Sequence, residues 1–153
     1  MNPLAEEFFA LSAGGKRVVH LELCRGALEV WTRYCREHPR IEYADSVVGC
    51  AHVVDAGLPR DALEAAELGQ RSADVEERYR EPLVALQDDD LELPEELEYA
   101  YYAIYNLYSK YVQVEPVDDW LVVNQAVSAL GVSSDGAWAA ALRAALEKAR
   151  DRG

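Results

Sequence analysis

Residues 97–112 of the chain read LEYAYYAIYNLYSKYV and contain six of its nine tyrosines. At 100° of helix turn per residue, the apolar side chains of this stretch gather on one arc. Residues on that arc are predicted to lie in a core: Leu97, Tyr101, Ile104, Tyr108 and Tyr111. The opposite arc carries Glu95, Tyr99, Tyr102, Asn106 and Lys110. The stretch therefore predicts an amphipathic helix that turns two tyrosines, Tyr99 and Tyr102, outward.

Helical spacing of apolar residues continues through the rest of the chain, and no alternating apolar and polar run indicates a strand. We expect an all-α fold, a single helical domain over residues 1–153. Its architecture is predicted to be a compact antiparallel bundle of six or seven helices with no sheet.

Capping residues and helix breakers set the expected helix bounds. In the first half, helices are expected from an Asn2 cap and Pro3 to Gly14–Gly15, from about Lys16 to Glu37, and from Tyr43 or Asp45 to Gly57. In the second half, we expect two helices between Pro59 and Gln87, one from Pro94 to Val112, one from Asp118 or Asp119 to about Leu130, and a last one capped by Ser134.

The composition combines a large apolar fraction with a large excess of acid. Of the 153 residues, 50% are hydrophobic, and 28 acidic side chains face 15 basic ones, giving a net charge of -13. The apolar fraction argues against intrinsic disorder, which requires low hydrophobicity. A chain this negative is repelled by phosphate groups, so we expect it to bind neither nucleic acid nor an anionic membrane.

No segment predicts secretion or membrane insertion. The first twenty residues carry Glu6 and Glu7 where a secretory signal has basic residues, and the uncharged stretches are shorter than the ~18–20 residues of a spanning helix. Three cysteines cannot all pair within one chain, which favours free thiols in a reducing compartment. These observations predict a cytoplasmic protein.

The negative charge is concentrated in one part of the chain. Residues 1–80 have a net charge of -4, residues 81–142 have -11 with Lys110 as their one base, and residues 143–153 have +2. Residues 88–98 alone contain seven acids and no base. Such a run is either a solvated face with helix N-terminal acids or a binding surface for a basic partner.

The absence of interleaved Lys or Arg and the tyrosines that follow favour the second interpretation. Tyrosine is enriched at protein interfaces because it buries a large rigid ring and still offers a hydroxyl. The predicted partner-binding residues are Asp88, Asp89, Asp90, Glu92, Glu95, Glu98, Tyr99 and Tyr102.

No residue pattern predicts catalysis, a cofactor or a metal. The pairs His20/Cys24 and Cys35/His38 have spacings that could chelate from one helix face, but neither pair completes a site. Cys50 and His52 point about 200° apart on the helix expected there and cannot share an ion. We therefore expect no catalytic residue, no bound cofactor and no metal.

The segment Glu98-Tyr99-Ala100-Tyr101-Tyr102 is chemically similar to the recognition surfaces of the helical colicin-nuclease immunity proteins. The similarity covers about a dozen residues, and helix phasing separates Tyr101 from Tyr102. It implies an immunity or inhibitor protein that neutralises a basic, nuclease-like bacterial toxin encoded nearby.

Two alternatives remain open at the level of sequence. The chain could be a helical scaffold or oligomerisation subunit. It could also be a ligand-binding bundle or enzyme with a pocket lined by Trp31, Trp120, Trp138, inward tyrosines and His20.

Overall fold

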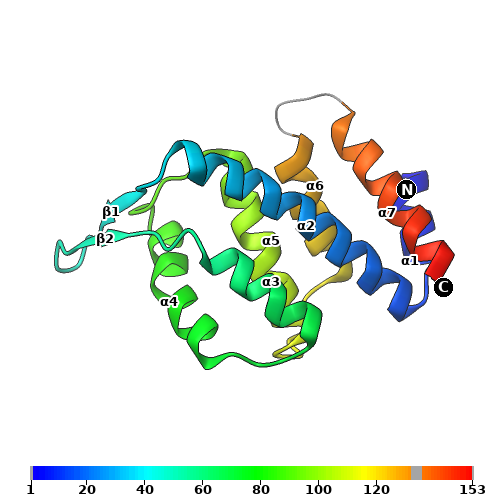
Figure 1. Cartoon of the computed structure of the whole chain (residues 1–153), viewed down its shortest axis with the longest axis horizontal. Coiled ribbons are helices and arrows are strands. Elements are labelled where there is room, and N and C mark those ends of the chain that lie inside the picture. Colours follow the sequence, from blue (N-terminus) through cyan, green and yellow to red (C-terminus); the bar gives the residue numbers. More distant parts are fainter. Residues whose placement is uncertain (1, 132–135, 153) are drawn as a thin grey trace.

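The computed structural model describes residues 2–131 and 136–152 and contains seven helices and one small sheet (Figure 1). The helices are α1 (Pro3–Phe9), α2 (Ala13–Glu37), α3 (Leu58–Leu68), α4 (Ala73–Gln87), α5 (Glu95–Tyr111), α6 (Asp119–Gly131) and α7 (Ala137–Arg152). The strands β1 (Glu42–Ala44) and β2 (Ala51–Val53) form an antiparallel hairpin. The predicted helical bundle is confirmed, and the prediction that no sheet exists is wrong. None of the described helices is long and apolar enough to cross a membrane.

Helix α5 lies in the middle of the fold, where α2, α3 and α6 pack against it (Figure 1). The predicted inner arc is buried at Leu97, Tyr101, Ile104 and Tyr108. The fifth member, Tyr111, is half-buried at the end of the helix. The tyrosine-rich stretch is therefore the central core helix that its spacing predicts.

The segment expected to be a helix from Tyr43 or Asp45 to Gly57 instead forms the hairpin and the loop that follows. The Asp45 carboxylate accepts the Val48 N–H at 2.7 Å, and the Gly49 N–H donates to the Asp45 carbonyl at 3.0 Å. Gly49 has φ +74°, a left-handed conformation that glycine adopts without strain. An aspartate that accepts hydrogen bonds from the next few backbone N–H groups, followed by a left-handed glycine, favours a turn over a helix.

Two helix ends also differ from the predictions. Helix α1 begins as expected, with the Asn2 side chain accepting the Leu4 N–H at 2.8 Å. It ends at Phe9 rather than at Gly14–Gly15, because Ser12 caps the next helix by accepting the Gly15 N–H at 3.1 Å. Both glycines therefore lie inside α2. Gly57, expected to end a helix, instead precedes the first residue of α3.

The last two helices close the bundle beside α2. The apolar side of α7 is buried at Leu142, Ala145, Leu146 and Ala149. Trp138, near the start of α7, is 36% exposed and packs close to Gly131, the last residue of α6. The predicted cap Ser134 lies outside the described residues.

Candidate functional site

The predicted partner-binding residues lie on the α4–α5 connection and the first turns of α5. Asp88, Asp89, Glu92 and Glu95 are exposed, and Asp90 and Glu98 are half-buried. Asp89 adopts a left-handed backbone conformation with φ 60°, which turns the chain out of α4. The structure therefore places these acids together at one end of two helices; with Tyr99 and Tyr102 they form what we call the acidic tyrosine surface.

The acids of this surface have no basic neighbours at ion-pair distance. Among the described residues, no Lys, Arg or His lies within 4.0 Å of a carboxylate between residues 88 and 98. Arg78 presents a contrast, since it bonds Asp55 at 2.7 Å and both Asp61 and Asp74 at 2.8 Å. Surface acids in the rest of the fold are thus often neutralised, whereas those of the acidic tyrosine surface are not.

One of these acids contributes to the fold instead. A single oxygen of Asp90 accepts both the backbone N–H and the hydroxyl of Ser46, each at 3.0 Å. This contact ties the hairpin to the α4–α5 connection. Asp90 is therefore less available to a partner than Asp88, Asp89 or Glu92.

The two tyrosines predicted to face outward are half-buried. Helix α6 covers the C-terminal half of the same arc, where Asn106 donates to Gln125 at 2.8 Å and Lys110 pairs with Asp119 at 2.6 Å. Tyr99 and Tyr102 lie in the first turns of α5, before these contacts, and are half-buried like Asn106 and Lys110. Burial and the neighbouring Glu98 raise the pKa of Tyr102, so its hydroxyl is protonated at neutral pH.

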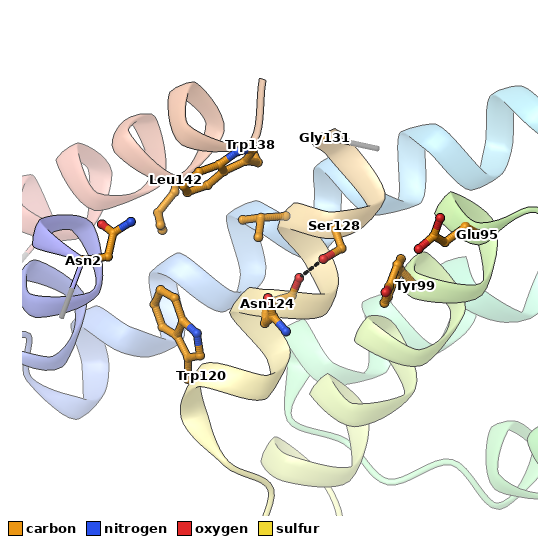
Figure 2. Close-up of a pocket in the computed structure, with 10 residues that line it drawn as sticks. Asn2, Glu95, Tyr99, Trp120, Asn124, Ser128, Gly131, Trp138 and Leu142 are labelled. Carbon is orange, nitrogen blue, oxygen red and sulfur yellow. Dashed lines mark hydrogen bonds between the residues drawn. The ribbon is translucent and has the colours of Figure 1, made fainter. Parts of the chain in front are cut away.

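A groove of about 400 Å³ adjoins the acidic tyrosine surface. Figure 2 shows Glu95 and Tyr99 of α5 on one side, Trp138 and Leu142 of α7 on the other, and Asn124 and Ser128 of α6 between them. Trp120 and Asn2 line the end away from Glu95 (Figure 2). We call this feature the tryptophan groove.

The groove contains part of the pocket that the ligand-binding alternative predicted. Trp120 and Trp138 line it, but Trp31 is buried elsewhere and donates its indole N–H to the Ala56 carbonyl at 2.9 Å. Sequence reasoning missed Asn124 and Ser128. Their polar side chains on a largely apolar helix were the available signal, but only the packing of α5 and α7 on both sides reveals the groove.

His20 is not part of the groove. It is fully buried, with Nδ1 2.6 Å from the Tyr111 hydroxyl and Nε2 2.7 Å from the Asp119 carbonyl. Since a carbonyl only accepts, Nε2 carries the proton and Nδ1 accepts from the tyrosine. Burial lowers the pKa of His20 to about 4, so the ring is neutral at pH 7. His20 therefore acts as a structural link between α2, α5 and α6.

Cys24 has no nucleophilic character in this fold. Its thiol is fully buried, and burial raises its pKa above the ordinary value, so it remains protonated at neutral pH.

One group of side chains has the composition of a metal site: Asp45, His52 and Glu81. Nε2 of His52 lies 2.9 Å from Oδ2 of Asp45 and 3.2 Å from Oε1 of Glu81. The Val48 N–H and then the His52 hydrogen bond lower the pKa of Asp45 to about 2, so this carboxyl is ionised. Sequence reasoning missed this group, because a helix was expected where the hairpin brings Asp45 and His52 together beside Glu81 of α4.

No family model matches the chain, and neither a curated protein nor a solved structure matches it.

Proposed function

We propose that the chain is a cytoplasmic protein-interaction module that binds a basic protein through the acidic tyrosine surface. The observation that carries the proposal is the set of carboxylates between residues 88 and 98 that no Lys, Arg or His of the described chain neutralises. Holding like charges together lowers stability, and a basic partner removes that cost on binding. The long-range field of such a surface also speeds encounter with a positive partner.

The tyrosines and the tryptophan groove supply the short-range part of the interaction. Tyr99 and Tyr102 are held on a packed helix and still have accessible surface, so they lose little conformational entropy on binding. The groove begins beside Tyr99 and Glu95 and offers two tryptophan rings to an apolar side chain. A basic partner with an apolar or aromatic side chain next to its charged patch fits this arrangement.

The most specific form of the proposal is an immunity protein for a nuclease-like toxin. A nuclease binds nucleic-acid phosphates in a positively charged cleft, and a row of carboxylates competes for the same positive groups. This form predicts that the partner is encoded next to the gene for this chain.

The test compares two triple variants with the same change in net charge. One variant neutralises the acidic tyrosine surface through Asp88→Asn, Asp89→Asn and Glu92→Gln. The control variant removes three other exposed acids through Glu6→Gln, Glu29→Gln and Glu64→Gln. Each tagged chain is used to capture partners from its own cell extract, and the affinity of the captured protein is then measured over a range of ionic strengths.

We expect the wild type to capture a basic protein with an affinity that falls steeply with salt. The surface variant should bind at least about tenfold more weakly and show a flatter salt dependence, whereas the control variant should bind like the wild type. Equal weakening of both variants, or an affinity indifferent to salt, would contradict the proposal. Failure to recover a basic protein, with self-association of the chain instead, would favour the scaffold alternative.

A further inference from the structure

The cluster of Asp45, His52 and Glu81 lies outside the acidic tyrosine surface, and the proposed function makes no use of it. From its geometry we infer that these three side chains bind a divalent transition-metal ion, with Zn²⁺ as the first candidate. Asp45 follows β1, His52 lies in β2, and Glu81 lies in α4, so the site exists only when the hairpin is folded against that helix.

The three ligand atoms converge at distances that suit a small metal ion. All of them lie within 4.8 Å of one another, and the two distances from His52 Nε2 to the carboxylate oxygens are 2.9 and 3.2 Å. Ligands bound to tetrahedral zinc at about 2.0–2.2 Å stand roughly 3.3–3.6 Å apart. An ion placed among these three atoms would require small side-chain shifts and would displace the proton between His52 Nε2 and the carboxylates.

Hydrogen bonds and a stacked aromatic ring orient the three ligands. The second oxygen of each carboxylate is already bonded: Asp45 Oδ1 accepts the Val48 N–H at 2.7 Å, and the Tyr43 hydroxyl donates to Glu81 Oε2 at 2.5 Å. The Tyr43 ring also stacks on the His52 imidazole with centroids 5.0 Å apart. Such supporting contacts orient metal ligands and raise the affinity of known sites.

The charge of the cluster favours a cation. In the part of the chain that the structure describes, His52 is the one basic side chain within 4.0 Å of either carboxylate. No Lys or Arg there offsets the repulsion between Asp45 and Glu81, which a divalent ion would remove. An imidazole with two carboxylates suits Zn²⁺, Co²⁺ or Mn²⁺ better than Mg²⁺ or Ca²⁺, which prefer oxygen ligands alone.

Metal binding would fasten the hairpin to the helical body. The hairpin is also held by the hydrogen bonds from Ser46 to Asp90, which lies in the acidic tyrosine surface, and by the bond from Tyr43 to Glu81. A metal that binds only the folded state raises the melting temperature with its concentration. The site would therefore stabilise the hairpin and the start of the acidic connection together.

The purified full chain is titrated with zinc chloride in a buffer free of chelators. Calorimetry measures the heat of binding, and NMR follows the imidazole signals. His52→Gln and Glu81→Gln each remove one ligand while keeping a polar side chain. His38→Gln is the matched control for an exposed histidine on the surface, and Cys50→Ser tests binding by an exposed thiol.

We expect the wild type to bind one zinc ion saturably at about 100 µM or less, with the His52 signals shifting in step. Binding should weaken at least tenfold in His52→Gln and Glu81→Gln and stay unchanged in the two controls, and zinc should raise Tm only where it binds. No saturable binding, wild-type affinity in His52→Gln, or loss confined to Cys50→Ser would each overturn the inference. Because the readout needs no protein partner, its failure leaves the proposed function untouched.

Discussion

Lowering the pH should destabilise this protein through His20 before the carboxylates contribute. The ring is fully buried and neutral, with one nitrogen bonded to the Asp119 carbonyl and the other to the Tyr111 hydroxyl. Its pKa is about 4 in the folded chain, whereas the ordinary histidine pKa of 6.5 applies once the chain unfolds. The unfolded state therefore binds more protons between pH 6.5 and pH 4, and stability falls as the pH drops through this range.

The two pKa values give the magnitude. From pH 7 to pH 5, protonation of the unfolded chain at His20 lowers the free energy of unfolding by about 2 kcal/mol. The full effect, reached below pH 4, is about 3 kcal/mol. Folding lowers the pKa values of paired acids such as Asp45 and Glu76 to about 2. These acids lose their stabilising effect only when the pH falls below the pKa that each has in the unfolded chain. The change in stability between pH 7 and pH 5 therefore reports the contribution of His20.

The assay is urea unfolding followed by tryptophan fluorescence at pH 7, 6 and 5. His20→Gln keeps a donor and an acceptor but cannot titrate, so its stability should change little with pH. The advantage of the wild type over this variant should therefore shrink by about 2 kcal/mol from pH 7 to pH 5. His38→Gln, at an exposed position, should follow the wild type. A constant difference between wild type and His20→Gln, or a His20 NMR titration midpoint at 6.5 or above, would contradict this prediction.

Three further predictions follow from packing and exposure. Tyr101→Phe should leave the free energy of unfolding unchanged or raise it by up to about 1 kcal/mol, because the buried Tyr101 hydroxyl has no hydrogen-bond partner among the described residues. Tyr108→Phe should lower it by about 1–2 kcal/mol, because the Tyr108 hydroxyl bonds Ser72 and Glu76. Gly131→Ala should cost about 1–3 kcal/mol in urea unfolding, because its Cβ would meet that of Trp138 at 2.9 Å. Tyr102→Ala should weaken binding to the captured basic protein about tenfold in calorimetry and lower Tm by only a few degrees.

Each of these predictions has a matched check. Gly14→Ala, in an exposed part of α2 where a Cβ meets only Ser12 Oγ at 3.9 Å, should be neutral or stabilising. A loss of stability from Tyr101→Phe as large as that from Tyr108→Phe would show that the Tyr101 hydroxyl is bonded after all. A collapse of Tm in Tyr102→Ala would assign this side chain to the core instead of the binding surface.

Helical elements with strong local signals could be predicted well. The spacing of Leu97, Ile104 and Tyr108 identifies α5 and its buried side, and the Asn2 cap marks the start of α1. The hairpin could not be found by the same rule, because Val47 and Val48 fit a helical spacing yet lie at an exposed tip. Their positions depend on the turn that Asp45 and Gly49 form, and this turn outweighs the apolar pattern.

The acidic run before the tyrosine helix could be located from the sequence, since charge and helix phasing are local properties. The packing of the described residues determines which of these acids have no ion pair there, because their potential partners lie on other elements. The structure also packs α6 against the C-terminal half of the outer arc of α5, where Asn106 bonds Gln125, and leaves Tyr99 and Tyr102 half-buried. It brought His52 to Glu81 as well. Contacts between residues far apart in the chain depend on how helices and hairpin pack, and helical periodicity carries no information about them.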